Sequence, residues 1–173
     1  MRILTGKYST TAFPFIFLLC LLIPGTINAQ EHIQNNPGME GIGKNSVYLE
    51  ILGNGAVYSI NFDRIIPIKN RHAMILRLGG NEYHGINTKK YSYNFIGSGG
   101  ILQGGPHRFF EAGLGYTSFS DSPDRLIVIE AGYRYQGKKG FLFRFTPMYI
   151  INSEKGDTFG NCPWFGFSFG FSF

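Results

Sequence analysis

The stretch Trp164–Phe173, with the sequence WFGFSFGFSF, decides the fold because phenylalanine occupies every second position in it. Successive side chains of an extended strand point to opposite faces, so one face carries phenyl rings and the other, apart from Trp164, carries only glycine and serine. In water such a strand would aggregate, because it combines high β-propensity with no charge. The alternation favours a strand with its apolar face toward lipid and its small face toward a narrow barrel interior. The residues expected to face lipid are Phe165, Phe167, Phe169, Phe171 and Phe173.

A last strand of alternating aromatics that ends in an aromatic residue resembles the assembly signal of bacterial outer-membrane β-barrel proteins. The resemblance covers about a tenth of the chain, namely residues 164–173. It implies a small barrel of the OmpA and OmpX type in the outer membrane. It also implies two partners, the outer-membrane lipid bilayer and the barrel assembly machinery, which would bind the C-terminal strand.

Residues 1–29 have the pattern of a cleavable secretory signal peptide. Arg2 and Lys7 give a positive start, 13–23 is an apolar run, and Ile27–Ala29 is a plausible cleavage site. The apolar run has about eleven residues, fewer than the roughly 20 that a membrane-spanning helix needs, so a retained anchor helix is the less favoured alternative. The rest of the chain has no long apolar segment, and a barrel is the other architecture that satisfies every backbone group in lipid. We therefore expect export to the outer membrane.

The remaining chain divides into two parts. Residues 30–45 are polar and aperiodic, and we interpret them as a flexible periplasmic N-terminal leader. Residues 46–173 show period-2 alternation broken by turn residues, which predicts an all-β domain, an eight-stranded antiparallel up-and-down transmembrane β-barrel. The predicted strands are 46–53, 56–66, 72–80, 91–103, 108–119, 125–136, 140–151 and 164–173.

The connections between these segments alternate in length, as periplasmic turns and outer loops do. Those after the second, fourth and sixth segments are short, and those after the third, fifth and seventh are longer and more polar. The exception is Gly53-Asn54-Gly55, where Asn-Gly suggests a tight type I′ hairpin turn. If these glycines were instead a kink in one long strand, the count would fall to seven, whereas bacterial single-chain barrels have even numbers of strands.

Charged residues within the predicted strands fall on the face opposite the apolar residues. An eight-stranded barrel has an interior that side chains fill, and charges placed there must be paired. We therefore expect a structural lumen charge network rather than a functional relay, and a lumen closed by paired charges. Its members are Glu50, Asp63, Arg77, Glu111, Glu130, Arg134 and Arg144.

Composition and motifs argue against most other binding chemistry. The net charge is +5, and loss of Arg2 and Lys7 would lower it to +3, an excess too small and too scattered in sequence to suggest nucleic acid or an anionic ligand. The histidines lack metal-ligand spacing. Gly97–Gly100 lacks the Lys-Ser/Thr ending of a phosphate loop. We expect no cofactor, no metal and no nucleic acid, and Cys162 would be the only cysteine left after processing.

Three functional hypotheses remain. The first is a non-enzymatic outer-membrane barrel whose outer loops, 81–90, 120–124 and 152–161, carry a structural or surface-binding role. The second is a lipid A-modifying enzyme, as in some barrels that this chain resembles, with His84 near Ser118, Ser120 and Asp121. The third is a soluble, secreted lipocalin-like barrel with an internal ligand. The crowded charges on the inner face disfavour the third hypothesis, because such a barrel should be apolar inside.

Overall fold

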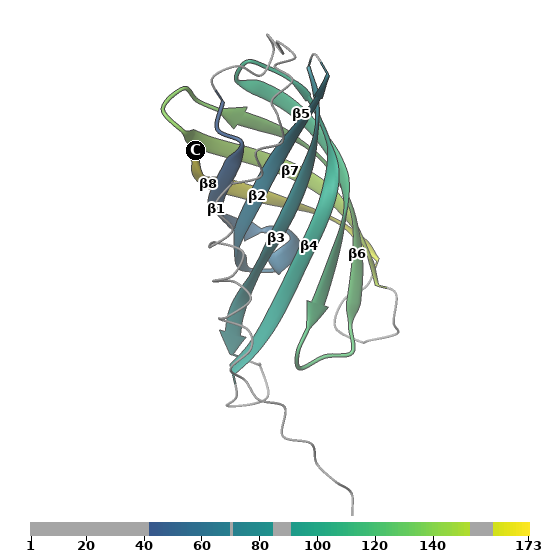
Figure 1. Ribbon diagram of the computed structural model, residues 1–173. Helices are drawn as coiled ribbons and strands as arrows, with labels where there is room; N and C mark the ends of the chain where they lie inside the picture. Colours follow the sequence, from purple (N-terminus) through teal and green to yellow (C-terminus); the bar gives the residue numbers. More distant parts are fainter. Residues whose placement is uncertain (1–41, 70, 85–90, 153–160) are drawn as a thin grey trace, which may run out of the picture. The chain divides into compact units, whose positions relative to one another are not determined.

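A computed structural model describes residues 42–69, 71–84, 91–152 and 161–173, and the expected signal peptide and most of the expected leader lie outside them. Each strand pairs antiparallel with the next in sequence, and β1 pairs with β8 to close the barrel (Figure 1). The predicted eight-stranded antiparallel barrel is thus confirmed. The strands are β1 (Asn45–Leu52), β2 (Tyr58–Lys69), β3 (His72–His84), β4 (Tyr91–Gly104), β5 (Arg108–Phe119), β6 (Arg125–Gln136), β7 (Phe141–Asn152) and β8 (Cys162–Ser172).

The barrel has two ends, which we name by their connections. The β2–β3, β4–β5 and β6–β7 connections lie at the short-turn end, together with the start of β1 and the end of β8. The β3–β4, β5–β6 and β7–β8 connections lie at the opposite, long-loop end, as does the β1–β2 connection. No helix among the described residues is long and apolar enough to cross a membrane.

Several strands run farther than their local sequence predicts. Pro67 was expected to begin a turn, but it lies inside β2, pairs with Ala73, and is followed by an irregularity in the ladder. Its side chain is exposed and β2 is near its end there, which is where a strand tolerates a missing N–H donor. β3 continues through the polar residues Asn81–His84, all of which pair with β4.

Glycine and proline commonly weaken strand pairing, but the glycines of β4 and the proline of β7 behave differently from each other. The glycines of β4 do not interrupt it, and Gly100 pairs with Gly113 of β5, where a Cβ on either residue would collide with the neighbouring backbone. Pro147 does interrupt pairing, because the β6–β7 ladder stops after Glu130↔Met148 and resumes at Tyr133↔Phe145 in the same register. The glycines therefore allow two strands to approach closely, whereas the proline breaks one ladder locally.

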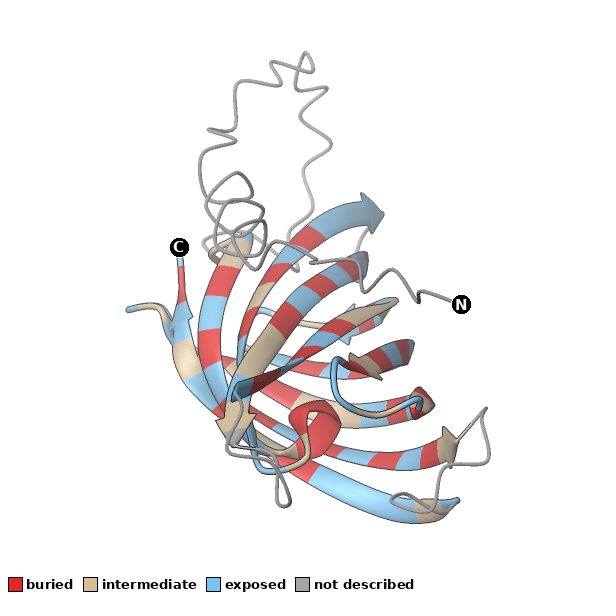
Figure 2. Cartoon of the chain, turned by 90° about the horizontal axis from the view of Figure 1, so that it is seen from below, coloured by how far each residue is buried: buried red, intermediate tan, exposed pale blue. Residues whose placement is uncertain are grey.

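Buried and exposed residues alternate along the strands, which gives each ribbon the banded pattern seen in Figure 2. In β8 and the residue after it, the phenylalanines face outward; Phe167 is half-buried and the other four are exposed. Gly166, Ser168 and Ser172 are buried on the inner face. The period-2 pattern of the sequence thus separates an outer from an inner surface around the barrel.

The interior is layered along the barrel. Toward the short-turn end an apolar cluster contains Ile65, Ala73, Ile75, Leu102 and Phe109. Toward the long-loop end a second cluster contains Phe119, Leu126, Val128, Met148 and Ile150. The buried ion pairs connect residues nearer the middle of the strands. The inner face therefore carries apolar residues as well as charges, and these apolar residues form two separate clusters on either side of the charges.

The β1–β2 connection differs from the expected type I′ hairpin turn. Gly53–Gly55 forms a short 3-10 turn, η1, whose residues are all buried, and it is the red coil in Figure 2. Ala56 follows with φ 66° and ψ −79°, and the Val57 N–H donates to the Gly55 carbonyl at 3.0 Å. This geometry is a γ-turn of the rare, strained kind. The type I′ prediction is therefore wrong, although η1 does join two separate strands and the strand count stays eight.

Candidate functional site

All seven charged side chains predicted for the lumen are buried inside the barrel, each with at most 6% of its surface exposed. They come from six of the eight strands: β1, β2, β3, β5, β6 and β7. Alternation explains why each points inward: along its strand, each is an even number of positions from the small or apolar residues that face the interior. Their mutual contacts divide them into two groups.

The first group is a pair across the lumen between β6 and β2. The Arg134 guanidinium donates to the two Asp63 carboxylate oxygens at 2.7 and 3.2 Å. It also donates to Ser46 Oγ at 2.7 Å and to Gln136 Oε1 at 3.2 Å. This bidentate geometry is the strong form of an arginine–carboxylate contact, and it ties three elements of the barrel wall together.

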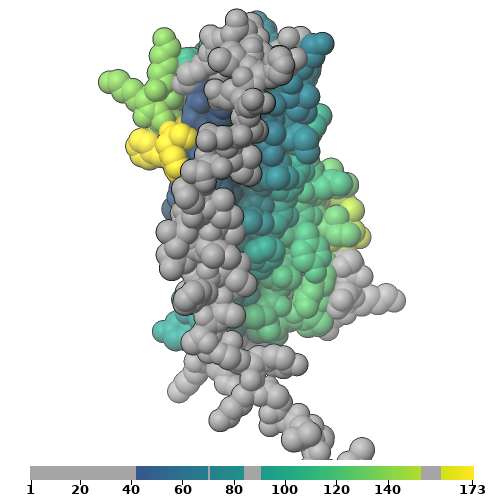
Figure 3. Space-filling model, viewed as in Figure 1, coloured from purple at the N-terminus to yellow at the C-terminus, as the bar shows by residue number. Residues whose placement is uncertain are grey.

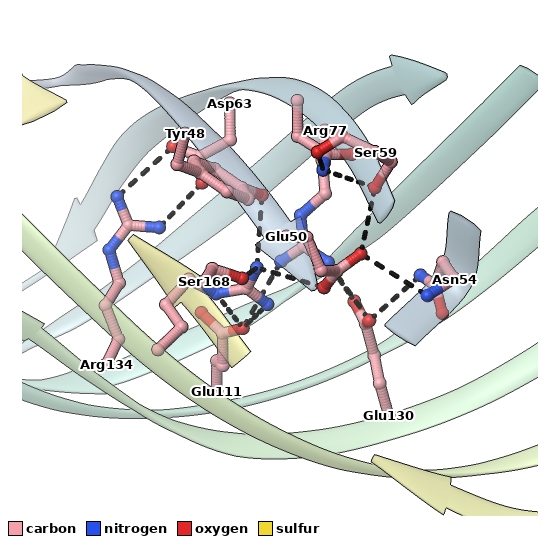
Figure 4. Close-up of polar contacts among 12 residues, drawn as sticks. Tyr48, Glu50, Asn54, Ser59, Asp63, Arg77, Glu111, Glu130, Arg134 and Ser168 are labelled. Atoms are coloured by element: carbon pink, nitrogen blue, oxygen red, sulfur yellow. Dashed lines mark hydrogen bonds and ion pairs between the residues drawn. The ribbon is translucent and has the colours of Figure 1, made fainter. Parts of the chain in front are cut away.

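The second group shares Glu111 between two arginines (Figure 4). Arg77 donates to Glu111 at 3.2 Å and to both oxygens of Glu130 at 3.0 and 3.1 Å. Arg144 donates to Glu111 through Nε at 2.8 Å and also through Nη2. Charges this deeply buried are costly unless they are paired, so the contacts account for how the interior tolerates them.

Tyr48 completes the second group and was not predicted as a member. Its ring lies under both guanidinium groups, with the centroid 5.2 Å from Arg144 Cζ and 5.9 Å from Arg77 Cζ. Its hydroxyl accepts a hydrogen bond from Arg144 Nη1 at 3.1 Å. Gly170 lies opposite Tyr48 on β8, where a Cβ would collide with the Val47 carbonyl and with Tyr48 Cα and Cβ. The sequence feature that could have identified Tyr48 is an aromatic residue at an inner-face position of its strand, paired with a glycine on the neighbouring strand.

Glu50 is the third carboxylate of the second group, beside only two guanidinium groups. Its Oε1 lies 3.9 Å from Arg144 Nη1 and has no hydrogen-bond partner. Its Oε2 accepts from the Asn54 backbone N–H and from Ser59 Oγ, both at 3.3 Å. The second group thus has three carboxylates and two arginines, and Glu50 is held mainly by neutral hydrogen-bond donors next to η1.

The η1 turn reaches from β1 and β2 to the far wall of the barrel. Asn54 Nδ2 donates to Glu130 on β6 at 3.3 Å, and the Asn54 carbonyl accepts from Thr117 Oγ1 on β5 at 3.2 Å. The Gly55 carbonyl accepts from Asn94 Nδ2 on β4 at 3.3 Å. Gly115 leaves space there, since a Cβ on it would lie 3.2 Å from Asn54 Nδ2. This turn covers the charge network from the long-loop side, and local sequence gave no sign of it.

The residues considered for an enzymatic site do not share one described cluster. Ser118 lies on the outward face of β5, Ser120 Oγ accepts from the Tyr93 N–H at 2.8 Å, and Asp121 accepts from the Tyr83 hydroxyl. His84 ends β3, and its side chain lies outside the described residues. Within the described ranges no group of three or more His, Cys, Asp or Glu side chains could hold a metal ion.

Of the three expected outer loops, only residues 120–124 are described in full, because 85–90 and 153–160 lie outside the described residues. Asp124 organises this connection: it accepts from Ser122 Oγ at 2.5 Å and from Asn152 Nδ2 at 2.8 Å. The β5–β6 connection is thereby fixed to the end of β7. It presents a defined surface at the long-loop end.

Comparison with protein-family models, with curated proteins and with solved structures finds no match to this chain.

Proposed function

We propose that this chain is an outer-membrane barrel of the type that the small OmpA and OmpX barrels represent. In this proposal the lumen is closed by paired charges, and the long-loop end carries a structural or surface-binding role. One observation supports it above all: the barrel is inverted relative to a soluble protein, with charges inside and large apolar side chains outside.

The outward apolar surface extends around the barrel. Leu114 is 61% exposed, and each of the other strands carries large apolar residues with 37–50% of their surface exposed. Soluble monomers rarely expose a contiguous apolar patch larger than a few hundred Å². Lipid would cover such a surface, whereas water would drive it to aggregate. Examples from other strands are Leu49, Ile60, Leu76, Phe95, Ile129, Phe145 and Phe169.

The interior argues against a lipocalin-like carrier. A soluble ligand-binding barrel needs an apolar cavity, but the middle of this interior is filled by buried arginine and glutamate side chains in contact with one another. The η1 turn occupies part of the remaining space. The same features support a closed lumen rather than a pore.

The long-loop end is the surface that this scaffold would present outside the cell. Recognition commonly lies on loops held by a rigid scaffold, and the β5–β6 connection is held in this way by Asp124. The partner would be a molecule at the cell surface.

Two fractionation measurements on cells that express the full chain test this proposal. We expect the protein to stay with outer membranes after alkaline washing, which strips peripheral proteins. We also expect its gel mobility to change on boiling, because a folded barrel resists detergent. Recovery of a detergent-free soluble monomer would contradict the proposal.

A further inference from the structure

Exposed cationic side chains gather at the short-turn end. They occupy the residue before β1, the second half of β2, the β2–β3 connection, the start of β5 and the β6–β7 connection. No aspartate or glutamate side chain among the described residues is exposed at this end; those outside the lumen, Glu82, Asp121 and Asp124, lie at the long-loop end. The exposed cations are Lys44, Arg64, Lys69, Arg71, Arg108, Lys138 and Lys139.

The topology explains this asymmetry. In an up-and-down barrel every second connection lies at the same end, so residues far apart in sequence become neighbours. Among the described residues, the fold therefore brings exposed cations that are scattered along the sequence to one end of the barrel. A one-sided basic surface attracts anionic partners, among them the headgroups of acidic lipids.

One part of this end forms an open surface pocket. It has a volume of about 390 Å³ and is lined by His107, Tyr135, Gly137, Lys138, Lys139 and Phe141. His107 Nδ1 lies 2.9 Å from the Gln136 carbonyl, which holds the imidazole against the β6–β7 connection. Tyr135 and Phe141 are in ring contact, with centroids 6.4 Å apart. The pocket thus combines cationic side chains with aromatic ones.

The aromatic side of the pocket continues into the outward apolar surface. Phe141 is exposed and pairs across strands with Phe171 of β8, which is also exposed. The β6–β7 connection lies beside the end of β8, because Ser172 N donates to the Gly140 carbonyl at 2.7 Å. In Figure 3 the light green atoms of this connection project next to the yellow end of the chain. A ligand in the pocket could therefore contact both the lysines and the lipid-facing aromatics.

We propose that this pocket binds the phosphate headgroup of an anionic phospholipid in the leaflet next to the short-turn end. Lys138 and Lys139 neutralise the phosphate, while the acyl chains lie against Tyr135 and Phe141. The apolar continuation favours a lipid over a soluble phosphate or an acidic peptide, neither of which would use the aromatic side. This inference rests on the proposed membrane location.

The test uses the full barrel reconstituted in nanodiscs that contain phosphatidylglycerol and phosphatidylcholine, with co-purified lipid counted by native mass spectrometry. The variant is Lys138→Gln/Lys139→Gln. The matched control, Lys69→Gln/Arg71→Gln, removes the same charge from the same end at residues that do not line the pocket. We expect the pocket variant to lose the preference for phosphatidylglycerol by about tenfold. The control should keep most of it.

Each of the following results would overturn the inference: unchanged preference in the pocket variant, equal loss in both variants, or equally effective displacement of the lipid by inorganic phosphate. Heat-modifiable gel mobility, measured on every sample, separates this inference from the proposed function. A wild-type barrel that inserts but shows no lipid preference overturns the inference alone. A chain that does not insert into bilayers overturns both.

Discussion

Arg134 on β6 and Asp63 on β2, which are 71 residues apart in sequence, meet inside the barrel through two hydrogen bonds of 2.7 and 3.2 Å. Neither side chain has measurable exposure. Each neutralises the other where no solvent reaches, and the pair spans from β2 to a strand that is not its neighbour. The stability of the barrel should therefore depend on the pair as a unit.

Arg134→Met should destabilise the barrel by about 3–5 kcal/mol, because it leaves Asp63 buried and unpaired. The double variant Asp63→Leu/Arg134→Met should recover much of this loss, since an apolar pair of similar volume leaves no buried charge behind. Urea unfolding of protein folded in lipid vesicles measures both. A double variant as unstable as the single one would contradict the assignment of Asp63 as the main partner.

Gly166→Leu should impair assembly more than Phe167→Leu. A Cβ at Gly166 would lie 2.8 Å from Gly53 Cα and 3.3 Å from Glu50 Oε1, so a larger side chain must displace η1. Overpacking of this kind costs about 1–3 kcal/mol. Phe167 faces outward beside Phe145, where leucine remains apolar. The folded fraction on unboiled gels measures the difference, and equal effects would show that the two faces of β8 are wrongly assigned.

Ala56→Gly should stabilise the barrel by about 1 kcal/mol, because Ala56 has a positive φ of 66° that glycine adopts without steric cost. The same change at Ala112, in the extended strand β5, is the control and should instead destabilise by about 0.5–1 kcal/mol. Denaturant midpoints in vesicles give both values. A loss of stability in Ala56→Gly would argue against the γ-turn at this position.

Asn54→Asp should destabilise more than Asn54→Ser. Serine loses the hydrogen bond to Glu130, at a cost of about 1–3 kcal/mol, whereas aspartate adds a fourth carboxylate beside two arginines. Asn152→Asp is the control, because Asn152 makes the same kind of contact with Asp124 in a partly buried position. There the added charge should cost less. Similar losses at both positions would show that η1 does not lie within the charge network.

The strands and their faces could be predicted from sequence because one rule governs them all. β5 and β6 begin and end at the predicted residues, since their alternation continues right up to clear turn residues. The ends of β2 and β3 could not be predicted in this way. Pro67 and Asn81 have the character of turn residues, but pairing with a neighbouring strand keeps both in extended conformation.

The site was predictable in part for a related reason. Parity shows which side chains point inward, and it placed Glu111 and Arg144 correctly on the inner face. Alternation does not give the height of each side chain along the barrel axis. The sharing of Glu111 by two arginines therefore could not be predicted from the sequence. The local signal of Asn54 favoured a hairpin turn, but hydrogen bonds to the far wall determine its conformation instead.

The central claim is that the outward face lies in lipid, and fluorescence quenching tests it most directly. Trp164 is the only tryptophan, so Trp164→Phe/Leu114→Trp would report from the middle of β5 on the exposed face. The control Trp164→Phe/Arg71→Trp reports from the short-turn end. In vesicles with lipids brominated deep in their acyl chains, we expect strong quenching at position 114 and weak quenching at 71. Equal, weak quenching at both positions, with position 114 open to an aqueous quencher, would contradict the account.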